Sequence, residues 1–224
     1  SLFDLTGRVA LVTGGARGLG EASSRAMARL GAVIVLSDID AEAASATADR
    51  LANETGAQVL ARGCDVTDPD DVDRLVSGLI EELGRLDILV NNAGIHRRVD
   101  PLDYDPDDVE AILAVNFRGA FQVAARVGRE MTRLGGGSIV NISALGGGIS
   151  GLGRAGSVYC MTKGGLVSLT RELAAEWGSS GVRVNALAPG WIRTPMTEAL
   201  QNNSERSARV MARVPLGRWG EADD

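Results

Sequence analysis

The chain has 224 residues, 45% of them hydrophobic, which is enough for one domain with a substantial core. Its formal net charge is −6, which disfavours nucleic acid and anionic membranes as partners because neither attracts an acidic protein. With His96 as the only histidine and two isolated cysteines, a multi-histidine or Cys/His metal site is excluded, and no metal is expected.

The sequence predicts a cytoplasmic protein. We find no apolar run long enough to span a bilayer, and the N-terminus lacks the basic start and the cleavage site of a signal peptide. Cys64 and Cys160 form no CxxC pair. Two reduced thiols are therefore expected, with Cys160 as a packing residue and not a nucleophile.

Six short, almost continuously apolar runs are typical of strands covered on both faces of a parallel sheet. They are residues 9–13, 33–38, 58–66, 87–94, 138–143 and 182–190. Helix-like stretches follow the first three, at residues 20–31, 40–56 and 68–84. The third stretch has Asp68 as its expected N-cap and Pro69 at its first position. The alternation predicts an α/β fold: a single doubly wound Rossmann domain over residues 1–224, with a parallel sheet, helices on both faces and right-handed crossovers.

The first predicted strand runs into the glycine-rich stretch TGGARGLG, residues 13–20. Gly14, Gly18 and Gly20 permit a tight turn and a close backbone approach to a pyrophosphate. The helix that starts inside this loop presents free N–H groups and its positive dipole end to the phosphates. Two alternatives remain open from this pattern alone: a glycine-rich turn without a ligand, and the loop of an enzyme that uses a nucleotide methyl donor.

Asp38, at the end of the second predicted strand, favours a nicotinamide dinucleotide over those alternatives. An acidic residue at this place accepts hydrogen bonds from the adenosine ribose hydroxyls and repels the 2′-phosphate of NADP. Arg17 argues the other way, since a guanidinium in the loop is able to hold that phosphate. We expect NAD as the cofactor, with NADP less favoured. Asp38 is also placed to cap the helix that follows it.

The chain resembles the short-chain dehydrogenase/reductase family through motifs that occur in the family's order and cover residues 7 to about 196. The matching segments are Thr13–Gly20, Asp65–Val66, Asn91–Gly94, Asn116, Ser143, Tyr159 with Lys163 (Y-x-x-x-K), and Pro189–Gly190 followed by Thr194. Each motif is weak alone, whereas the set is specific. NNAGIHRR and VPLGRWGEADD also resemble the sugar-acid branch, that of gluconate and 2-deoxygluconate dehydrogenases, although acyl-carrier-protein reductases share much of both.

The resemblance implies roles for the matching residues. Those implied around the dinucleotide are Gly14, Arg17, Gly18, Leu19 and Gly20 in the loop, Asp38 at the ribose, Asp65 and Val66 at the adenine, Asn91, Ala93 and Gly94 along the cleft, Pro189, Gly190, Ile192 and Thr194 near the nicotinamide, and Tyr159 and Lys163. Ser143, Tyr159 and Lys163 are implied as a catalytic trio, with Asn116 supporting a proton-relay water.

Elementary electrostatics explains why a tyrosine and a lysine one helical turn apart suit this chemistry. The nicotinamide takes the hydride of an alcohol, and a protein group must take the hydroxyl proton. An ammonium roughly 6 Å from a phenolate stabilises it by about 3 kcal/mol, or roughly two pKa units. We therefore expect Lys163 to lower the pKa of Tyr159 and Ser143 to donate to the substrate oxygen. Taken singly, these residues and Asn116 also fit a solvated helix face, a turn and a buried amide.

Arg97 and Arg98, which follow the fourth predicted strand beside His96, are candidates to bind a substrate carboxylate; a solvated basic loop is the alternative. The glycine-rich residues 144–158 predict a flexible substrate lip. Two long predicted helices, residues 117–134 and 163–177, have broad apolar faces and predict a homo-oligomer, a dimer or a tetramer. The resemblance also implies a further helix and a sheet-edge strand beyond Asp224.

The expected function is hydride transfer between NAD and a small secondary alcohol or ketone, with a sugar acid as one candidate. An NADPH-dependent 3-oxoacyl-acyl-carrier-protein reductase is the second candidate. A non-catalytic dinucleotide-sensing protein is a third, from another class. Sensing proteins of this kind tend to lose the tyrosine, the lysine or the serine, and all three are present here.

Overall fold

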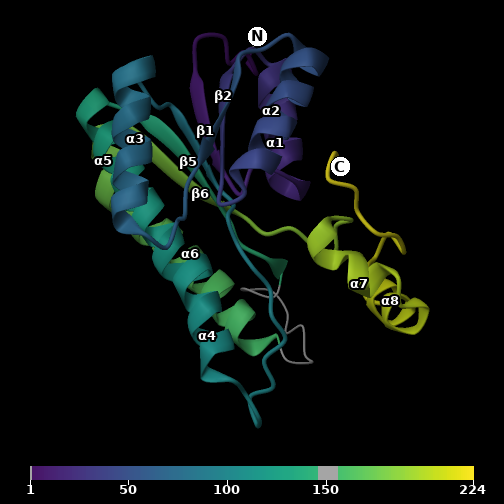
Figure 1. Ribbon diagram of the computed structural model, residues 1–224. Coiled ribbons are helices and arrows are strands. Elements are labelled where there is room, and N and C mark those ends of the chain that lie inside the picture. Colours follow the sequence, from purple (N-terminus) through teal and green to yellow (C-terminus); the bar gives the residue numbers. More distant parts are fainter. Residues whose placement is uncertain (1, 146–155) are drawn as a thin grey trace.

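The computed structural model of the protein describes residues 2–145 and 156–224. At its centre lies a six-stranded parallel sheet in the order β3-β2-β1-β4-β5-β6 (Figure 1). The strands are β1 Val9–Thr13, β2 Val33–Asp38, β3 Val59–Gly63, β4 Ile88–Asn91, β5 Gly137–Ile142 and β6 Val182–Leu187. The strand order reverses direction between β1 and β4, and ligands of doubly wound sheets bind at the carboxyl ends of the strands at such a switch point.

Helices cover both faces of this sheet: α1 and α2 lie on one face, and α3, α5 and α6 on the other (Figure 1). Side chains of β2 alternate between the two layers, since Ile34 and Leu36 pack toward α1 and α2 while Val35 packs toward α3 and α5. The helices are α1 Gly18–Arg29, α2 Ala41–Thr55, α3 Pro69–Leu83, α4 Pro106–Leu113, α5 Ala120–Leu134, α6 Ser157–Trp177, α7 Glu198–Gln201 and α8 Ser204–Met211. Burial on both faces explains the continuous apolar runs and confirms the predicted fold class.

Local capping chemistry confirms one expectation and corrects another. Asp68 caps α3 by accepting a hydrogen bond from the backbone of Asp70, and Pro69 occupies the first turn, as predicted. The expected capping role of Asp38 is wrong, because Asp40 caps α2 by accepting from the backbone of Ala43. Asp38 instead accepts from the backbone N–H of Ala16, 3.2 Å away, and from that of Asp40. Its carboxylate therefore faces the glycine loop.

The helix expected at residues 117–134 has a different start. A π-helical turn, Ala114–Gly119, joins α4 to α5, so the regular helix begins only at Ala120. Asn116 lies in this wide turn and is fully buried. Turns of this kind occur frequently at functional sites. The other long helix, α6, begins at Ser157, six residues earlier than expected, and so contains both Tyr159 and Lys163.

A carboxylate links the amino ends of β1 and β4, at the end of the sheet opposite to the switch point. Asp87 accepts hydrogen bonds from Arg8, from Arg85 and from the backbone of Val9 at the start of β1. Burial alone raises the pKa of Asp87, but these three donors outweigh burial and lower the pKa overall. A hollow of about 920 Å³ lies at this end of the sheet, and none of the candidate catalytic residues lines it.

None of the helices in the described parts of the chain combines the length and the apolar character needed to cross a membrane. In the same residues, we find no group of three or more His, Cys, Asp or Glu side chains that could hold a metal ion.

Candidate active site

The carboxyl ends of the central strands and the start of α6 meet at a cleft of about 110 Å³. Nine of the residues predicted from the sequence line it: Leu19, Gly94, Ser143, Tyr159, Lys163, Pro189, Gly190, Ile192 and Thr194. Asn92, Met196 and Thr197 are further lining residues that the sequence analysis did not single out. Parts of the chain as far apart as the glycine loop and the segment after β6 therefore share one site. Of the expected substrate lip, residues 146–155 lie outside the described residues.

The glycine loop turns sharply between β1 and α1. Gly14 and Gly18 have φ of 60° and 59°, a left-handed conformation that glycine adopts without strain. A Cβ at Gly20 would collide with the carbonyl oxygen of Gly14 and lie 2.8 Å from Nδ2 of Asn92. The N-terminus of α1 has no side-chain cap, so its first N–H groups are available to an anion. A tight backbone cradle with an uncapped helix end fits the pyrophosphate of a dinucleotide.

Asn92 fastens this loop to β4. Its side-chain amide donates to the carbonyl oxygens of Thr13 and Gly14, at 3.0 and 2.9 Å. The hydroxyl of Thr13 accepts in return from the backbone of Asn92 and Ala93. By contrast, the amide of Asn91 is buried and donates to Ala120 and to Asn141, so Asn91 has a structural role beneath the cleft. The second asparagine of the NNAG motif was the signal for this residue.

Arg17, expected near the adenosine, is already paired with a carboxylate. Arg17 donates to Asp40 at 3.0 Å, and both side chains are about half exposed. Asp65 forms a turn by accepting from the backbone and the hydroxyl of Thr67, while Val66 is buried. β3 ends at Gly63 and not at residue 66 as expected, so Asp65 and Val66 follow the strand, and they are not among the residues that line the cleft.

Tyr159 and Lys163 lie one turn apart on α6, with Nζ 5.8 Å from the centre of the phenol ring. Nζ donates to the carbonyl of Ile142 at the end of β5, at 2.7 Å. Burial raises the pKa of Tyr159 to about 12 and lowers that of Lys163 to about 8. The expected lowering of the pKa of Tyr159 is thus not produced by the protein's own groups, because burial, with the neighbouring Cys160 acting in the same direction, raises that pKa.

Ser143 and Asn116 are both held by backbone groups. The Ser143 hydroxyl is buried and donates to the carbonyl of Lys163 at 2.7 Å. The amide of Asn116 accepts from the backbone N–H of Ile95 and donates to its carbonyl, both at 2.8 Å. A Cβ at Gly94 would lie 3.3 Å from Oδ1 of Asn116 and 3.5 Å from Nζ of Lys163. Glycine at this position therefore leaves Asn116 and Lys163 close together.

Three basic residues follow β4 in the chain, and one of them, His96, contacts Tyr159. The ring of His96 lies edge-on to Tyr159, with centroids 5.0 Å apart, and burial together with the nearby charge of Arg98 lowers the pKa of His96. Arg97 forms a 2.7 Å ion pair with Asp108. Arg98 forms no hydrogen bond or ion pair within the described residues. The two expected substrate arginines thus differ, and Arg98 is the one with its guanidinium unpaired.

Comparison with known proteins agrees with this geometry. Residues 14–224 match a family model described as enoyl-(acyl carrier protein) reductase. The chain is 38% identical over 224 residues to gluconate 5-dehydrogenase of Gluconobacter oxydans (strain 621H), covering 100% of this chain and 86% of that protein. The chain belongs to the short-chain dehydrogenase/reductase family. It is an NAD(P)-dependent oxidoreductase that acts on CH–OH groups.

Two further members show the range of this family around the chain. Galactitol 2-dehydrogenase (L-tagatose-forming) of Cereibacter sphaeroides is 40% identical over 225 residues, with 100% of this chain and 87% of that protein covered. The crystal structure of a gluconate 5-dehydrogenase from Burkholderia cenocepacia J2315, in complex with NADP and tartrate, superposes with a TM-score of 0.93. It is 37% identical and covers 99% of this chain and 86% of that one.

Proposed function

We propose that the protein transfers a hydride between a nicotinamide cofactor, NAD in preference to NADP, and a secondary alcohol or ketone, with a sugar acid as the favoured substrate. The observation that carries this proposal is the convergence of Ser143, Tyr159 and Lys163 on one cleft with Leu19 of the glycine loop and with Thr194. No single strand or helix supplies this set. The fold brings it together at the switch point of the sheet.

The residues that would hold the cofactor lie at the glycine loop, at the ends of β2 and β3, and in the segment after β6. The uncapped start of α1 would bind the pyrophosphate, Asp38 the ribose hydroxyls, Asp65 and Val66 the adenine, and Ile192 and Thr194 the nicotinamide end. When bound, the nicotinamide supplies the hydride acceptor or donor. The protein must supply the group that donates or accepts the proton.

Tyr159 is the proposed acid and base. With a pKa of about 12 it holds its proton at neutral pH and is suited to donate it to a substrate oxygen during ketone reduction. The phenolate left behind is stabilised by the ammonium of Lys163. In the opposite direction, the same ammonium and the positive charge of the oxidised nicotinamide together would lower the pKa of the phenol. Lys163 thus has two roles, since it is also placed to bind the ribose.

Ser143 and Asn116 would support this proton transfer. A serine hydroxyl has one hydrogen, and that of Ser143 is given to the Lys163 carbonyl. To donate to a substrate oxygen it must rotate, and otherwise it acts as an acceptor. Both polar atoms of the Asn116 side chain are used by Ile95. A relay water near Asn116 would therefore be bound by the backbone of the π-helical turn and not by the amide.

Asp38 supports NAD as the preferred cofactor. Its carboxylate lies against the glycine loop, and the Arg17 charge that could compensate a 2′-phosphate is paired with Asp40. The Burkholderia relative holds NADP in its crystal structure, so NADP is the second candidate. An NADPH-dependent 3-oxoacyl-acyl-carrier-protein reductase is the alternative activity, because a relative that is 36% identical over 223 residues is named a 3-oxoacyl-acyl-carrier-protein reductase. A dinucleotide sensor is disfavoured because the cleft contains the complete trio.

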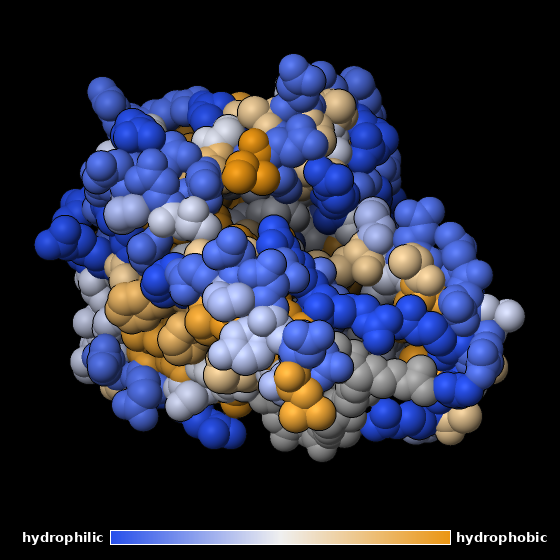
Figure 2. All heavy atoms as spheres, turned by 60° about the horizontal axis from the view of Figure 1, so that its bottom comes forward, coloured by the Kyte–Doolittle hydropathy of each residue, from blue (hydrophilic) through white to orange (hydrophobic). Residues whose placement is uncertain are grey.

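We also propose that the protein is a homo-oligomer. Phe117 and Phe121, at the junction of the π-helical turn and α5, are 43% and 51% exposed. Figure 2 shows hydrophobic side chains gathered on one side of the face of the molecule that it presents. The predicted apolar stripe of α6 is buried within the protein at Leu166 and Leu173, so we propose the junction as the surface that contacts a second copy. A monomeric mass in light scattering at micromolar concentration would contradict this proposal.

The Tyr159→Phe variant tests the proposed reaction. We expect the variant to bind dinucleotide as the wild type does and to lose turnover by at least about a hundredfold. Wild-type and variant proteins should be compared on polyols, sugar acids and β-keto esters, with reduced nicotinamide followed by absorbance. Undiminished turnover in the variant would refute the assigned role of Tyr159. Turnover on β-keto esters alone would replace the sugar-acid proposal by the oxoacyl reductase.

A further inference from the structure

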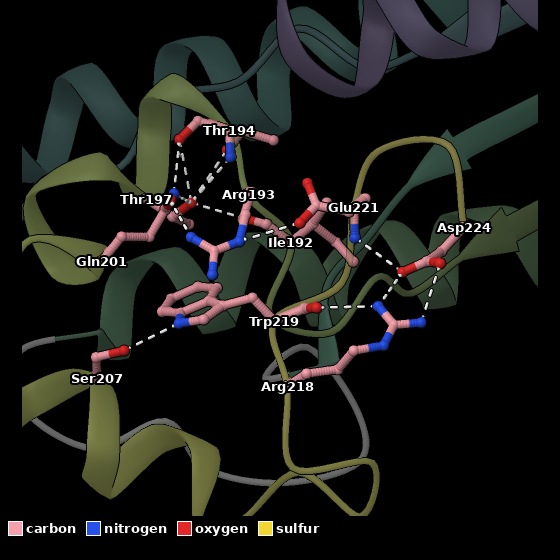
Figure 3. A network of polar contacts seen from close by, with 10 residues as sticks. All are labelled: Ile192, Arg193, Thr194, Thr197, Gln201, Ser207, Arg218, Trp219, Glu221 and Asp224. Atoms are coloured by element: carbon pink, nitrogen blue, oxygen red, sulfur yellow. Dashed lines mark hydrogen bonds and ion pairs between the residues drawn. The ribbon is translucent and has the colours of Figure 1, made fainter.

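Trp219 is the one buried residue of the C-terminal segment, residues 218–224, and it lies beside two helices that have none. The side chain of Trp219 is 5% exposed, whereas α7 and α8 contain no buried residue. Figure 3 shows its ring between α8 and the residues that follow β6. A pair of short helices without buried side chains has little packing of its own, so its position depends on such contacts.

The indole of Trp219 contacts both α8 and the residues that follow β6. Nε1 donates to the hydroxyl of Ser207 on α8 at 2.9 Å. The ring lies edge-on to that of Trp191, with centroids 6.2 Å apart, and the guanidinium of Arg193 lies 6.0 Å from its centre. Trp219 thus connects α8 to the cleft segment, which we define as residues 191–197.

The backbone next to Trp219 holds the cleft segment more directly. Gly220 donates to the carbonyl of Trp191 at 2.9 Å and accepts from the backbone of Arg193 at 2.8 Å, so a short parallel bridge encloses Ile192. A Cβ at Gly220 would lie 2.6 Å from Cδ1 of Ile192, so the two bridged segments are in close contact. A 3.0 Å ion pair between Arg193 and Glu221 closes the bridge at its outer side (Figure 3).

The cleft segment carries this constraint to the cofactor side of the cleft. The hydroxyl of Thr197 donates to the carbonyl of Ile192 at 2.7 Å and accepts from the backbone of Thr194 at 3.1 Å. Thr194 in turn lies against the glycine loop, since a Cβ at Gly18 would be 3.4 Å from the Thr194 side chain. Ile192, Thr194 and Thr197 all line the cleft, while Trp219 does not.

We propose that Trp219 is a positioning residue, which fixes Ile192 and Thr194 against the glycine loop and thereby sets how tightly the cofactor is held. The proposal rests on the proposed function in one respect, namely that Ile192 and Thr194 contact the nicotinamide end. Trp219 acts through the cleft segment and touches no reacting atom. Its removal should therefore change cofactor binding and the KM for the cofactor far more than it changes kcat.

The test compares three variants of the full chain. Trp219→Leu removes the ring and its N–H, Ser207→Ala removes only the acceptor of that N–H, and Trp177→Leu removes a tryptophan that packs on Gly128 in the core, away from the cleft. Amide hydrogen exchange is measured by mass spectrometry over residues 191–201 and over the sheet. The dissociation constants of NADH and NADPH are measured by fluorescence, and kcat and KM by absorbance.

We expect Trp219→Leu to accelerate exchange in residues 191–197 by about tenfold, with the sheet unchanged, and to weaken dinucleotide binding by about fivefold or more. Ser207→Ala should act in the same direction by about threefold, the effect of one hydrogen bond. Trp177→Leu should lower Tm and leave both readouts as in the wild type. Unchanged exchange and binding in Trp219→Leu, or exchange that rises equally in the sheet, would overturn the proposal.

The exchange measurement separates this proposal from the proposed function. If the wild type binds neither dinucleotide, the oxidoreductase proposal fails, and the exchange of residues 191–197 in Trp219→Leu still decides whether Trp219 holds the cleft segment.

Discussion

The ammonium nitrogen of Lys163 lies 5.8 Å from the centre of the Tyr159 ring, and it donates to the carbonyl of Ile142, not to the phenol. One helical turn brings the two residues together, but the end of β5 decides where the ammonium is held. Lys163 is also the only lysine in the sequence, and only 3% of its surface is accessible to solvent. A charge this buried costs free energy unless neighbouring groups offset it.

The ammonium of Lys163 is deeply buried. Because burial is what lowers its pKa to about 8, the titration of this lysine is the most direct test of the site's electrostatics. Lysine labelled with ¹³C at Cε gives a single side-chain signal from this chain. We expect that signal to titrate near pH 8, and a midpoint near 10.5 would contradict the buried ammonium.

The same shift predicts how stability depends on pH. Between about pH 8 and 10.5 the unfolded chain binds more protons at Lys163 than the folded chain, so this residue makes the folded state more stable as pH rises. Lys163→Met removes the effect. We expect the variant's gain in unfolding free energy over the wild type to be largest at pH 7, at most about 3 kcal/mol, and to shrink toward pH 10. A difference that does not vary with pH in denaturant titrations would contradict this.

Gly20→Ala should damage the glycine loop, because its new Cβ would collide with the carbonyl of Gly14 and approach the amide of Asn92. We expect dinucleotide affinity to fall by about tenfold or more, as measured by fluorescence titration. Gly78→Ala is the matched control, since Gly78 lies inside α3 with nothing within 4 Å of an added Cβ. It should stabilise the protein by about 0.5–1 kcal/mol and leave binding unchanged. Equal affinities in the two variants would count against the cradle.

The sequence predicted the parallel sheet and the alternation of strands and helices because these depend on local patterns, whereas most residues of the cleft were implied by the resemblance to the family. Apolar runs, caps and the glycine loop are encoded by neighbours in the chain. The features that the sequence did not predict depend on contacts between distant segments. The π-helical turn around Asn116, the link from Asn92 to Gly14, and the contact of Trp219 with Trp191 join residues that no local pattern relates.

The sequence alone also could not predict which groups each side chain contacts. Asp38 and Asp40 both lie between the end of β2 and the first turn of α2, and only the geometry shows that Asp40 is the cap and that Asp38 faces Ala16. In the same way, the opposing effects of burial and charge on Tyr159 could not be weighed without knowing how deeply it lies.

Asp38→Ala should shift the cofactor preference toward NADP. Removing the carboxylate at the glycine loop removes the repulsion of a 2′-phosphate, so we expect the ratio of kcat/KM for NADP over NAD to rise by about tenfold or more. Asp40→Asn is a useful companion, because asparagine keeps the helix cap while releasing Arg17 from its ion pair. It should raise the same ratio by less. An unchanged ratio in Asp38→Ala would show that Asp38 does not select the cofactor.

Arg98 and Arg97 provide a matched pair for the substrate. Arg98 has no ion-pair partner within the described residues, whereas Arg97 is paired with Asp108. A free guanidinium is available to a carboxylate, and a paired one must first give up its partner.

We expect Arg98→Gln to raise the KM for gluconate by about tenfold and to leave the KM for a neutral polyol such as galactitol within about twofold. Arg97→Gln should change neither KM by more than about twofold, since an exposed ion pair contributes about 1 kcal/mol or less. If the two variants raise the KM for gluconate equally, or if Arg98→Gln raises it equally for galactitol, Arg98 does not bind the carboxylate, and a neutral alcohol becomes the better candidate for the substrate.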